Sequence, residues 1–170
     1  MNQPHYILLP ANNWFVAFSL IAAFILNLLP KGGLAAIPDF VALVLVFWSI
    51  HQPRKVGIGI AFFMGLLMDV HNATLLGENA LAYTLLSYVA IMLHRRVLWF
   101  QLPTQALHIL LLLLLAQLAH ALVHLIHSGR FPGWDYFLGS LVAALLWPLA
   151  SALLLAPQRR AVDRDENRPL

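Results

Sequence analysis

Six runs of apolar residues, divided by short junctions that contain proline, glycine or polar residues, make up most of the chain. A helix needs about 20 predominantly apolar residues to cross the roughly 30 Å hydrocarbon core of a bilayer, since each residue adds about 1.5 Å along its axis. The pattern therefore predicts an all-α integral membrane protein with six transmembrane helices. The predicted spans are Trp14–Leu29, Phe40–Ile50, Val56–Val70, Leu75–Leu93, Thr104–Ile126 and Tyr136–Ala156.

The second and third runs contain only 11 and 15 residues, fewer than a full span requires. Each crosses the bilayer only if it is tilted, extends into its flanks, or lies where the protein thins the membrane. A re-entrant hairpin is the alternative. We prefer two full spans, because the basic residues alternate between the two sides of the membrane only if both runs cross.

Lys and Arg are distributed unevenly among the junctions, with only Lys31 and Arg130 on one side and eight residues on the other. Short cytoplasmic segments collect Lys and Arg, so both termini are predicted to be cytoplasmic. Residues 1–157 then form a single six-helix transmembrane domain, and residues 158–170 form a short polar cytoplasmic tail. The eight basic residues are Arg54, Lys55, Arg95, Arg96, Arg159, Arg160, Arg164 and Arg168.

The composition strengthens the membrane assignment and excludes several classes of protein. Of the 170 residues, 61% are hydrophobic and 10% are charged, whereas soluble domains carry about 25% charged residues. No Lys or Arg precedes the first apolar run, so we expect a retained span and not a removable signal peptide. The net charge of +3 is spread over the junctions and the tail, which indicates topology signals and no nucleic-acid partner.

Four acidic residues are predicted at the ends of spans opposite to the basic side. Asp39 follows Pro38 and begins the second span, and Glu78 occupies the equivalent place in the fourth, so both are predicted to cap helix N-termini. Asp69 ends the third span. Because an ionisable group at such depth is costly, we expect it to face inward and to accept hydrogen bonds from the next junction or the first turn of the fourth span. A transported proton or a bound ligand is the alternative for Asp69. The fourth acid is Asp135.

Several helix faces carry small or polar residues. Gly57, Ala61 and Gly65 recur every four residues ahead of Asp69 and predict close internal packing of helices. Pro148 lies within the sixth span and is predicted to kink it. Another polar strip, predicted to face the interior or a cavity, consists of Tyr83, Thr84, Ser87 and Tyr88.

The fifth span carries a polar strip that we interpret as a candidate partner-binding face. Histidines one turn apart can bind zinc, but the sequence shows no further ligands or second-shell partners, so no metal is predicted. An interhelical hydrogen-bond seam is the other alternative. We favour partner binding because these groups have no evident internal mates. The strip is Gln117, His120, His124 and His127, and a second candidate face is Ser140, Ala144, Trp147 and Ser151.

The stretch PDFVALVLVFWSIHQPRKVGIGIAFFMGLLMDVHNATLLGENALAY resembles the MreD family of rod-shape-determining membrane proteins. The resemblance rests on PD, an apolar span ending in Trp, a Pro with basic residues, GLLxDV at Gly65–Val70 and LGxxAL ending at Leu81, in order and spacing. It covers residues 38–89 closely and the rest only by span count and the Trp-Pro pair of the last span. The resemblance implies a multi-pass protein of the bacterial cytoplasmic membrane.

The resemblance also implies a function in the machinery that elongates lateral peptidoglycan. It implies MreC as the direct partner, reached through its transmembrane helix, with MreB, RodA and a penicillin-binding transpeptidase as indirect partners. The implied fold is similar to the S-component of energy-coupling-factor transporters. No enzymatic activity and no cofactor come with it, in agreement with the absence of a phosphate loop, nucleophile elbow or metalloprotease signature.

Two functions of different classes follow from these observations. The first is a non-enzymatic membrane scaffold that binds and orients a partner's transmembrane helix. The second is a small-molecule carrier subunit, since interior Tyr, Thr, Ser and acidic groups can hold a solute. A carrier site is expected near the membrane midplane at broken helices, whereas these acids lie near one surface, so we favour the scaffold.

Overall fold

The computed structural model describes residues 7–8, 11–29 and 37–160. Over these residues the chain is almost entirely helical, with seven α-helices, two short 3₁₀ turns and one pair of two-residue strands. The elements are β1 (Ile7–Leu8), α1 (Asn13–Leu28), α2 (Phe40–His51), α3 (Ile58–Asn72), α4 (Glu78–Trp99), α5 (Leu102–Ser128), η1 (Trp134–Phe137), α6 (Leu138–Leu145), α7 (Trp147–Leu155), η2 (Ala156–Gln158) and β2 (Arg159–Arg160).

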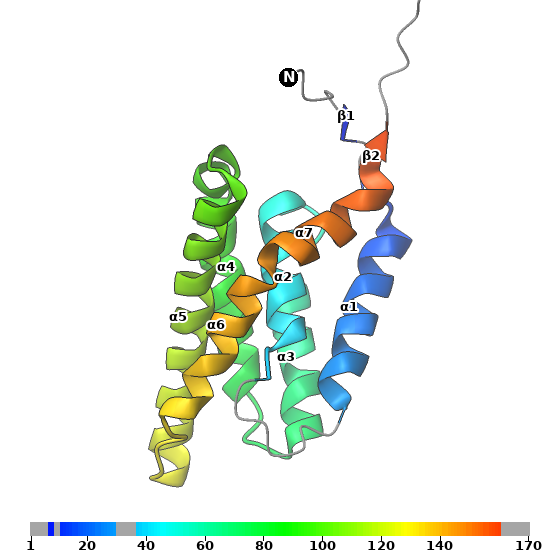
Figure 1. The fold of residues 1–170 in the computed structure, drawn as a ribbon. Helices are drawn as coiled ribbons and strands as arrows, with labels where there is room; N and C mark the ends of the chain where they lie inside the picture. The colour runs from blue at the N-terminus through cyan, green and yellow to red at the C-terminus, as the bar shows by residue number, and fades with distance from the viewer. Residues whose placement is uncertain (1–6, 9–10, 30–36, 161–170) are drawn as a thin grey trace, which may run out of the picture.

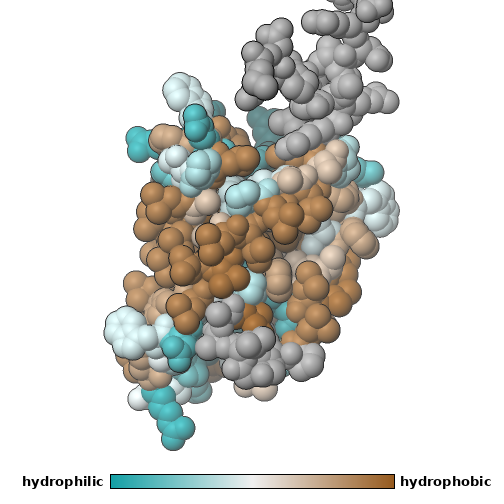
Figure 2. Space-filling model, viewed as in Figure 1, coloured by the Kyte–Doolittle hydropathy of each residue, from teal (hydrophilic) through white to brown (hydrophobic). Residues whose placement is uncertain are grey.

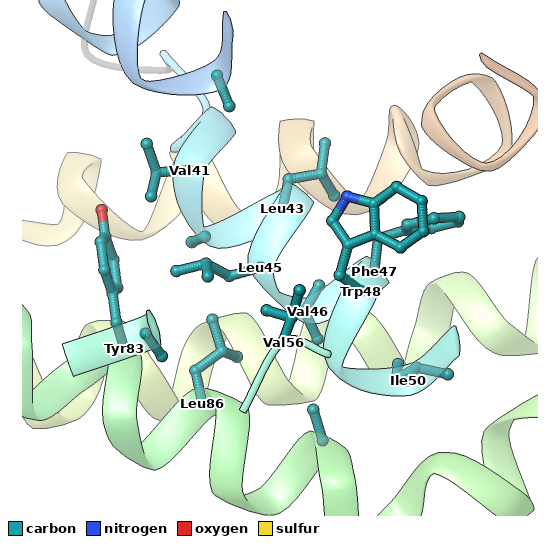
Figure 3. Close-up of a cluster of buried hydrophobic side chains, with 14 of the residues drawn as sticks. Val41, Leu43, Leu45, Val46, Phe47, Trp48, Ile50, Val56, Tyr83 and Leu86 are labelled. Carbon is teal, nitrogen blue, oxygen red and sulfur yellow. The ribbon is translucent and has the colours of Figure 1, made fainter. Parts of the chain in front are cut away.

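The helices run up and down a single bundle whose central member is α2 (Figure 1). Nine of the twelve residues of α2 are buried, and α2 contacts α1, α4, α5, α6 and α7. Figure 3 shows its apolar side chains packed against Tyr83 and Leu86 of α4. The indole Nε1 of Trp48 donates to Ser19 Oγ at 2.8 Å, which ties α2 to α1. Because protein surrounds α2, its short length does not expose polar backbone to lipid.

Both ends of the described chain lie at one end of the bundle. Strand β1 pairs antiparallel with β2, with Ile7 opposite Arg160 and Leu8 opposite Arg159. The α2–α3 and α4–α5 turns lie at this same end, which we call the basic end because it carries Arg54, Lys55 and Arg95 (Figure 1). The junctions after α3 and α5 lie at the other end.

Six apolar runs correspond to six helical stretches, with boundaries that differ from the predicted ones by a few residues. The kink predicted at Pro148 is confirmed, because the last stretch is broken into α6 and α7 at Leu146 with a bend of 45°. Among the described residues, α5 alone is long and apolar enough to cross a membrane as one straight helix, and the bent pair also qualifies if it is one span. Helices α1, α2 and α3 are apolar but shorter.

The outer surface is apolar over the middle of the visible face and hydrophilic toward both ends (Figure 2). Large apolar side chains point outward from several helices, including Phe18, Phe63, Leu122 and Leu145, which are between 57% and 72% exposed. A soluble monomer does not expose apolar residues on this scale. The surface is that of a protein surrounded by lipid.

The closest helix contact joins α3 to the first turn of α4. A Cβ added to Gly65 would lie 2.3 Å from Ala80 Cα and 2.6 Å from Ala80 N, so only glycine permits this approach. Ala61, one turn earlier, is fully buried. Gly57 was expected to take part in the same close packing, but nothing lies within 4 Å of a Cβ added to it. It is the N-cap residue of α3. The packing stripe therefore begins at Ala61, and the assignment of Gly57 to it is wrong.

We predict that Gly65→Ala lowers the free energy of unfolding by about 2 kcal/mol or more, because the added methyl group forces α3 and α4 apart. Gly59→Ala is the matched control, since nothing lies within 4 Å of that Cβ in the same helix, and helix propensity makes the change neutral or slightly stabilising. Thermal unfolding of both purified variants in one detergent measures the difference. Equal unfolding midpoints would contradict the role given to Gly65.

Candidate functional site

Polar side chains from five helices gather at the end of the bundle opposite the basic end. Each comes from the start or end of a helix or from a polar position on its inner face. Together they form a network whose members are buried or half-buried. The network consists of Asn27, Asp39, Asp69, Glu78, Asn79, Tyr83, Gln117, His120, His124 and Tyr136.

Asp69 accepts hydrogen bonds from the beginning of α4. Its Oδ1 accepts from the backbone N–H of Asn79 at 2.7 Å and from Asn79 Nδ2 at 2.9 Å, and its Oδ2 accepts from the N–H of Gly77 at 2.8 Å. Thr74 Oγ1 and the N–H of Ala80 complete the set at 3.3 Å each. The side chain is fully buried. The carboxylate thus caps α4 from the preceding helix and meets the positive end of its dipole.

Asp39 joins three helices. Its Oδ1 accepts from the N–H of Ala42 at 3.0 Å, which caps α2, and from Asn27 Nδ2 of α1 at 2.7 Å. Its Oδ2 accepts from the hydroxyl of Tyr83 of α4 at 2.6 Å. Asn27 was not singled out from the sequence, although an Asn near the end of an apolar span is itself a signal. Its Oδ1 accepts from the N–H of Phe40 at 3.0 Å and closes a ring of hydrogen bonds with Asp39.

Glu78 does not cap α4, which corrects the expectation. Gly77 is the N-cap residue, and the helix has no side-chain cap from its own N-cap. The carboxylate of Glu78 is instead directed at α5, where His124 Nδ1 lies 2.9 Å and His120 Nε2 lies 3.4 Å from Oε1. Only 1% of Glu78 is exposed. Since Asp69 already satisfies the first N–H groups of α4, the side chain of Glu78 is available for the histidines.

The polar strip of α5 therefore has internal mates, and the premise that it lacks them is wrong. Gln117 Nε2 donates to the carbonyl of Tyr136 at 3.2 Å, and the ring of His120 stacks on Tyr136 with centroids 5.5 Å apart. His127 alone of the strip is exposed. The second candidate face also points inward, because its members are at most 5% exposed: Ser140, Ala144, Trp147 and Ser151.

The strip predicted on α4 is only partly internal. Tyr83 and Ser87 are buried, and Ser87 Oγ lies 2.9 Å from Ser49 Oγ of α2. Thr84 bonds the Ala80 carbonyl of its own helix at 2.6 Å. Tyr88 is 49% exposed, so its predicted inward orientation is wrong.

A cavity of about 260 Å³ lies within the network, with Asp39, Asn79 and Tyr83 on one wall and Gln117, His120 and Tyr136 on the other. Two buried atoms of this wall, Gln117 Oε1 and His120 Nδ1, have no hydrogen-bond partner among the described residues. A cavity of this size and polarity holds ordered water or one small polar molecule. In the described part of the chain no group of three His, Asp or Glu is placed to hold a metal ion.

We predict that Asp69→Leu lowers the free energy of unfolding by about 3 kcal/mol or more, because several buried N–H donors at the start of α4 lose their acceptor. Asp69→Asn keeps one acceptor oxygen and is expected to lose less. Asp135→Leu removes an exposed acid at the same end and is the control. Folded yield in membranes and thermal unfolding in detergent rank the variants. An Asp69→Leu variant as stable as Asp135→Leu would contradict the capping role.

We predict that His124→Leu destabilises the fold by about 3 kcal/mol, since buried Glu78 loses its nearest partner. His127→Leu, one turn further along α5 and exposed, should leave the unfolding midpoint within error of the parent. The double variant Glu78→Leu/His124→Leu should lose less than the sum of the two single variants. Additive losses would show that Glu78 and His124 do not interact.

Comparison of the chain with known proteins assigns it to a family. The chain matches the family described as rod shape-determining protein MreD over residues 10–156. It is similar to the rod shape-determining protein MreD of Haemophilus influenzae, with 31% identity over 154 residues that cover 86% of this chain and 93% of the relative. No solved structure matches the chain. The chain belongs to the MreD family of membrane proteins, which determine rod shape and are not enzymes.

Proposed function

We propose that this protein is a scaffold of the lateral peptidoglycan elongation machinery that holds the transmembrane helix of MreC. Through MreC it is linked to MreB, RodA and a penicillin-binding transpeptidase. The observation that carries the proposal is that the polar and acidic groups are engaged with one another inside the bundle, while the outside is apolar and grooved. Such a protein can recognise a helix in the membrane.

The proposed architecture is six transmembrane spans in the cytoplasmic membrane with both termini in the cytoplasm, in a fold similar to the S-component of energy-coupling-factor transporters. Three observations support it. Six apolar helical stretches alternate in direction (Figure 1), β1 pairs with β2 at one end, and Arg54, Lys55, Arg95 and Arg96 share that end, as the positive-inside rule requires of cytoplasmic segments.

Fusion reporters test this orientation. We predict that a reporter active only in the periplasm is silent after Leu170 and active when inserted within residues 32–35. A reporter active only in the cytoplasm should give the complementary result at both positions. The reverse pattern would overturn the proposed topology. Activity of the same reporter at both sites would place both on one side of the membrane, so that one fewer helix would cross between them.

The groove proposed for the MreC helix lies between α1 and α7, over α2. It encloses about 400 Å³, and its walls include Ala22 and Ala23 of α1 and Ala150 of α7. Its one polar lining side chain is Ser19, whose hydroxyl already donates to the carbonyl of Val16 and accepts from Trp48. Helices associate in lipid through close packing at small residues, so an apolar groove whose Phe and Leu side chains are interrupted by three alanines suits another apolar helix. The strip of α5 is no longer the proposed surface, because a partner there would have to break the contacts of Glu78.

Bulky residues in this groove should weaken partner capture. We predict that Ala22→Phe and Ala150→Phe each reduce the amount of co-expressed MreC that co-purifies by about tenfold, because the side chain occupies the space of the partner helix. Ala17→Phe, which changes the other side of α1, is the control and should capture MreC as the parent does. Equal capture of MreC by all variants would place the partner elsewhere. Gel filtration of each variant measures its folded yield independently, so that a loss of folding is not mistaken for a loss of capture.

A carrier function is the second candidate, and the polar cavity favours it. Two atoms on its wall have no hydrogen-bond partner among the described residues. Gln117 Oε1 can accept a hydrogen bond from a small polar solute, and His120 Nδ1 can accept or donate one. Mass spectrometry of small molecules released from the purified protein tests this candidate. A compound that is retained by the parent and lost in Gln117→Leu would support a carrier, and an empty or water-filled cavity would leave the scaffold.

A further inference from the structure

A second groove lies between α1 and α3 beneath the α2–α3 turn, and the functions above do not use it. It encloses about 550 Å³. Its long walls are apolar and come from two helices, whereas the residues at one of its ends are polar. The walls are Val16, Ala17, Leu20 and Ile21 of α1 with Ile60 and Met64 of α3, and the polar end is Asn13, Arg54 and Lys55.

The cations at the polar end have no carboxylate beside them in the described part of the protein. Arg54 is exposed, and the two contacts between a basic side chain and a carboxylate found among the described residues join histidines to Glu78, at the other end of the bundle. Lys55 Nζ donates to the carbonyl of Ala11, which fixes it beside the start of α1. A positively charged end without a carboxylate is complementary to an anionic group.

The depth of the groove corresponds to one leaflet of a bilayer. From Asn13 to Ile21 the wall of α1 extends about 12 Å at 1.5 Å per residue, and half of a hydrocarbon core of about 30 Å is about 15 Å. The charged end therefore lies at headgroup level while the apolar walls lie at the level of the acyl chains. Basic pockets between transmembrane helices on the cytoplasmic side are known to hold anionic headgroups.

We propose that this groove binds one anionic phospholipid, with its phosphate between Arg54 and Lys55 and an acyl chain between α1 and α3. A glycerophospholipid with a net negative headgroup supplies both the charge and the apolar length that the groove requires. An apolar helix would leave both cations without an anionic partner. The inference goes beyond the scaffold function and shares with it only the orientation of the basic end.

The test measures lipid retention by the full-length protein in detergent, using native mass spectrometry with dioleoylphosphatidylglycerol and dioleoylphosphatidylcholine, which have the same chains. The parent should retain one phosphatidylglycerol and should not retain phosphatidylcholine. Arg54→Gln/Lys55→Gln should weaken retention about 30-fold, at about 1 kcal/mol for each basic residue. Arg54→Gln alone, at an exposed residue, should weaken it about fivefold and guards against misfolding of the double variant.

Two matched controls separate the groove from general electrostatics. Arg95→Gln/Arg96→Gln removes two exposed charges at the same end and should change retention less than twofold. Ala17→Trp fills the groove without changing any charge and should abolish retention, whereas Ala152→Trp on α7 should not.

Four results would overturn the proposal. Equal retention of the two lipids would mean that charge does not select the ligand. Equal loss of retention in Arg54→Gln/Lys55→Gln and in Arg95→Gln/Arg96→Gln would mean a diffuse surface effect. Retention that appears only when Asp163, Asp165 and Glu166 are neutralised, or a co-purified protein helix displaced by Ala17→Trp, would assign the groove to the tail or to a protein.

Discussion

The first turn of α4 begins inside the protein, and its backbone N–H groups need an acceptor there. Glu78, Asn79 and Ala80 are at most 7% exposed, so water cannot satisfy these donors, and unpaired buried N–H groups are costly. The N–H of Glu78 donates to the carbonyl of Leu75, and the carboxylate of Asp69 in the neighbouring helix accepts from the N–H groups of Gly77, Asn79 and Ala80. It reaches them because Gly65, one turn earlier in α3, lets the two backbones come into contact. Gly65 and Asp69 are thus two parts of one constraint.

The position of α4 set by this constraint determines the partners of the other polar groups. Tyr83, just over one turn into α4, reaches Asp39 at the start of α2, and Asp39 in turn holds Asn27 of α1. Glu78, freed from capping, reaches His124 of α5. Loss of Asp69 is therefore expected to disturb contacts on four other helices, since none of these pairs is local in sequence.

With its polar groups engaged inside, the protein presents an apolar surface to the membrane. The parts of this surface differ from one another in their shape and in the presence of small residues. Charges remain at the ends, where Arg54 and Lys55 line one end of the groove between α1 and α3. The two grooves beside α1 differ in this respect, since that toward α7 is lined almost wholly by apolar residues and that toward α3 is closed by cations. Helix α1 can thus serve two kinds of neighbour on its two sides.

The sequence by itself determined the number and approximate limits of the helical stretches, because apolar length and proline or glycine punctuation are local properties. It also indicated the break at Pro148 and the cap at Asp39, which depend on neighbours within a few residues. It indicated the small-residue stripe that includes Gly65, but only the tertiary structure showed that Gly65 meets Ala80 of α4. The role of Glu78 and the direction of the α5 strip were decided by the tertiary structure. Glu78 and His124 are 46 residues apart, and helical periodicity says which side chains share a face but not what that face meets. In water a polar face points outward, but in lipid the outside is as apolar as the core, so the pattern alone could not distinguish an internal seam from a binding surface.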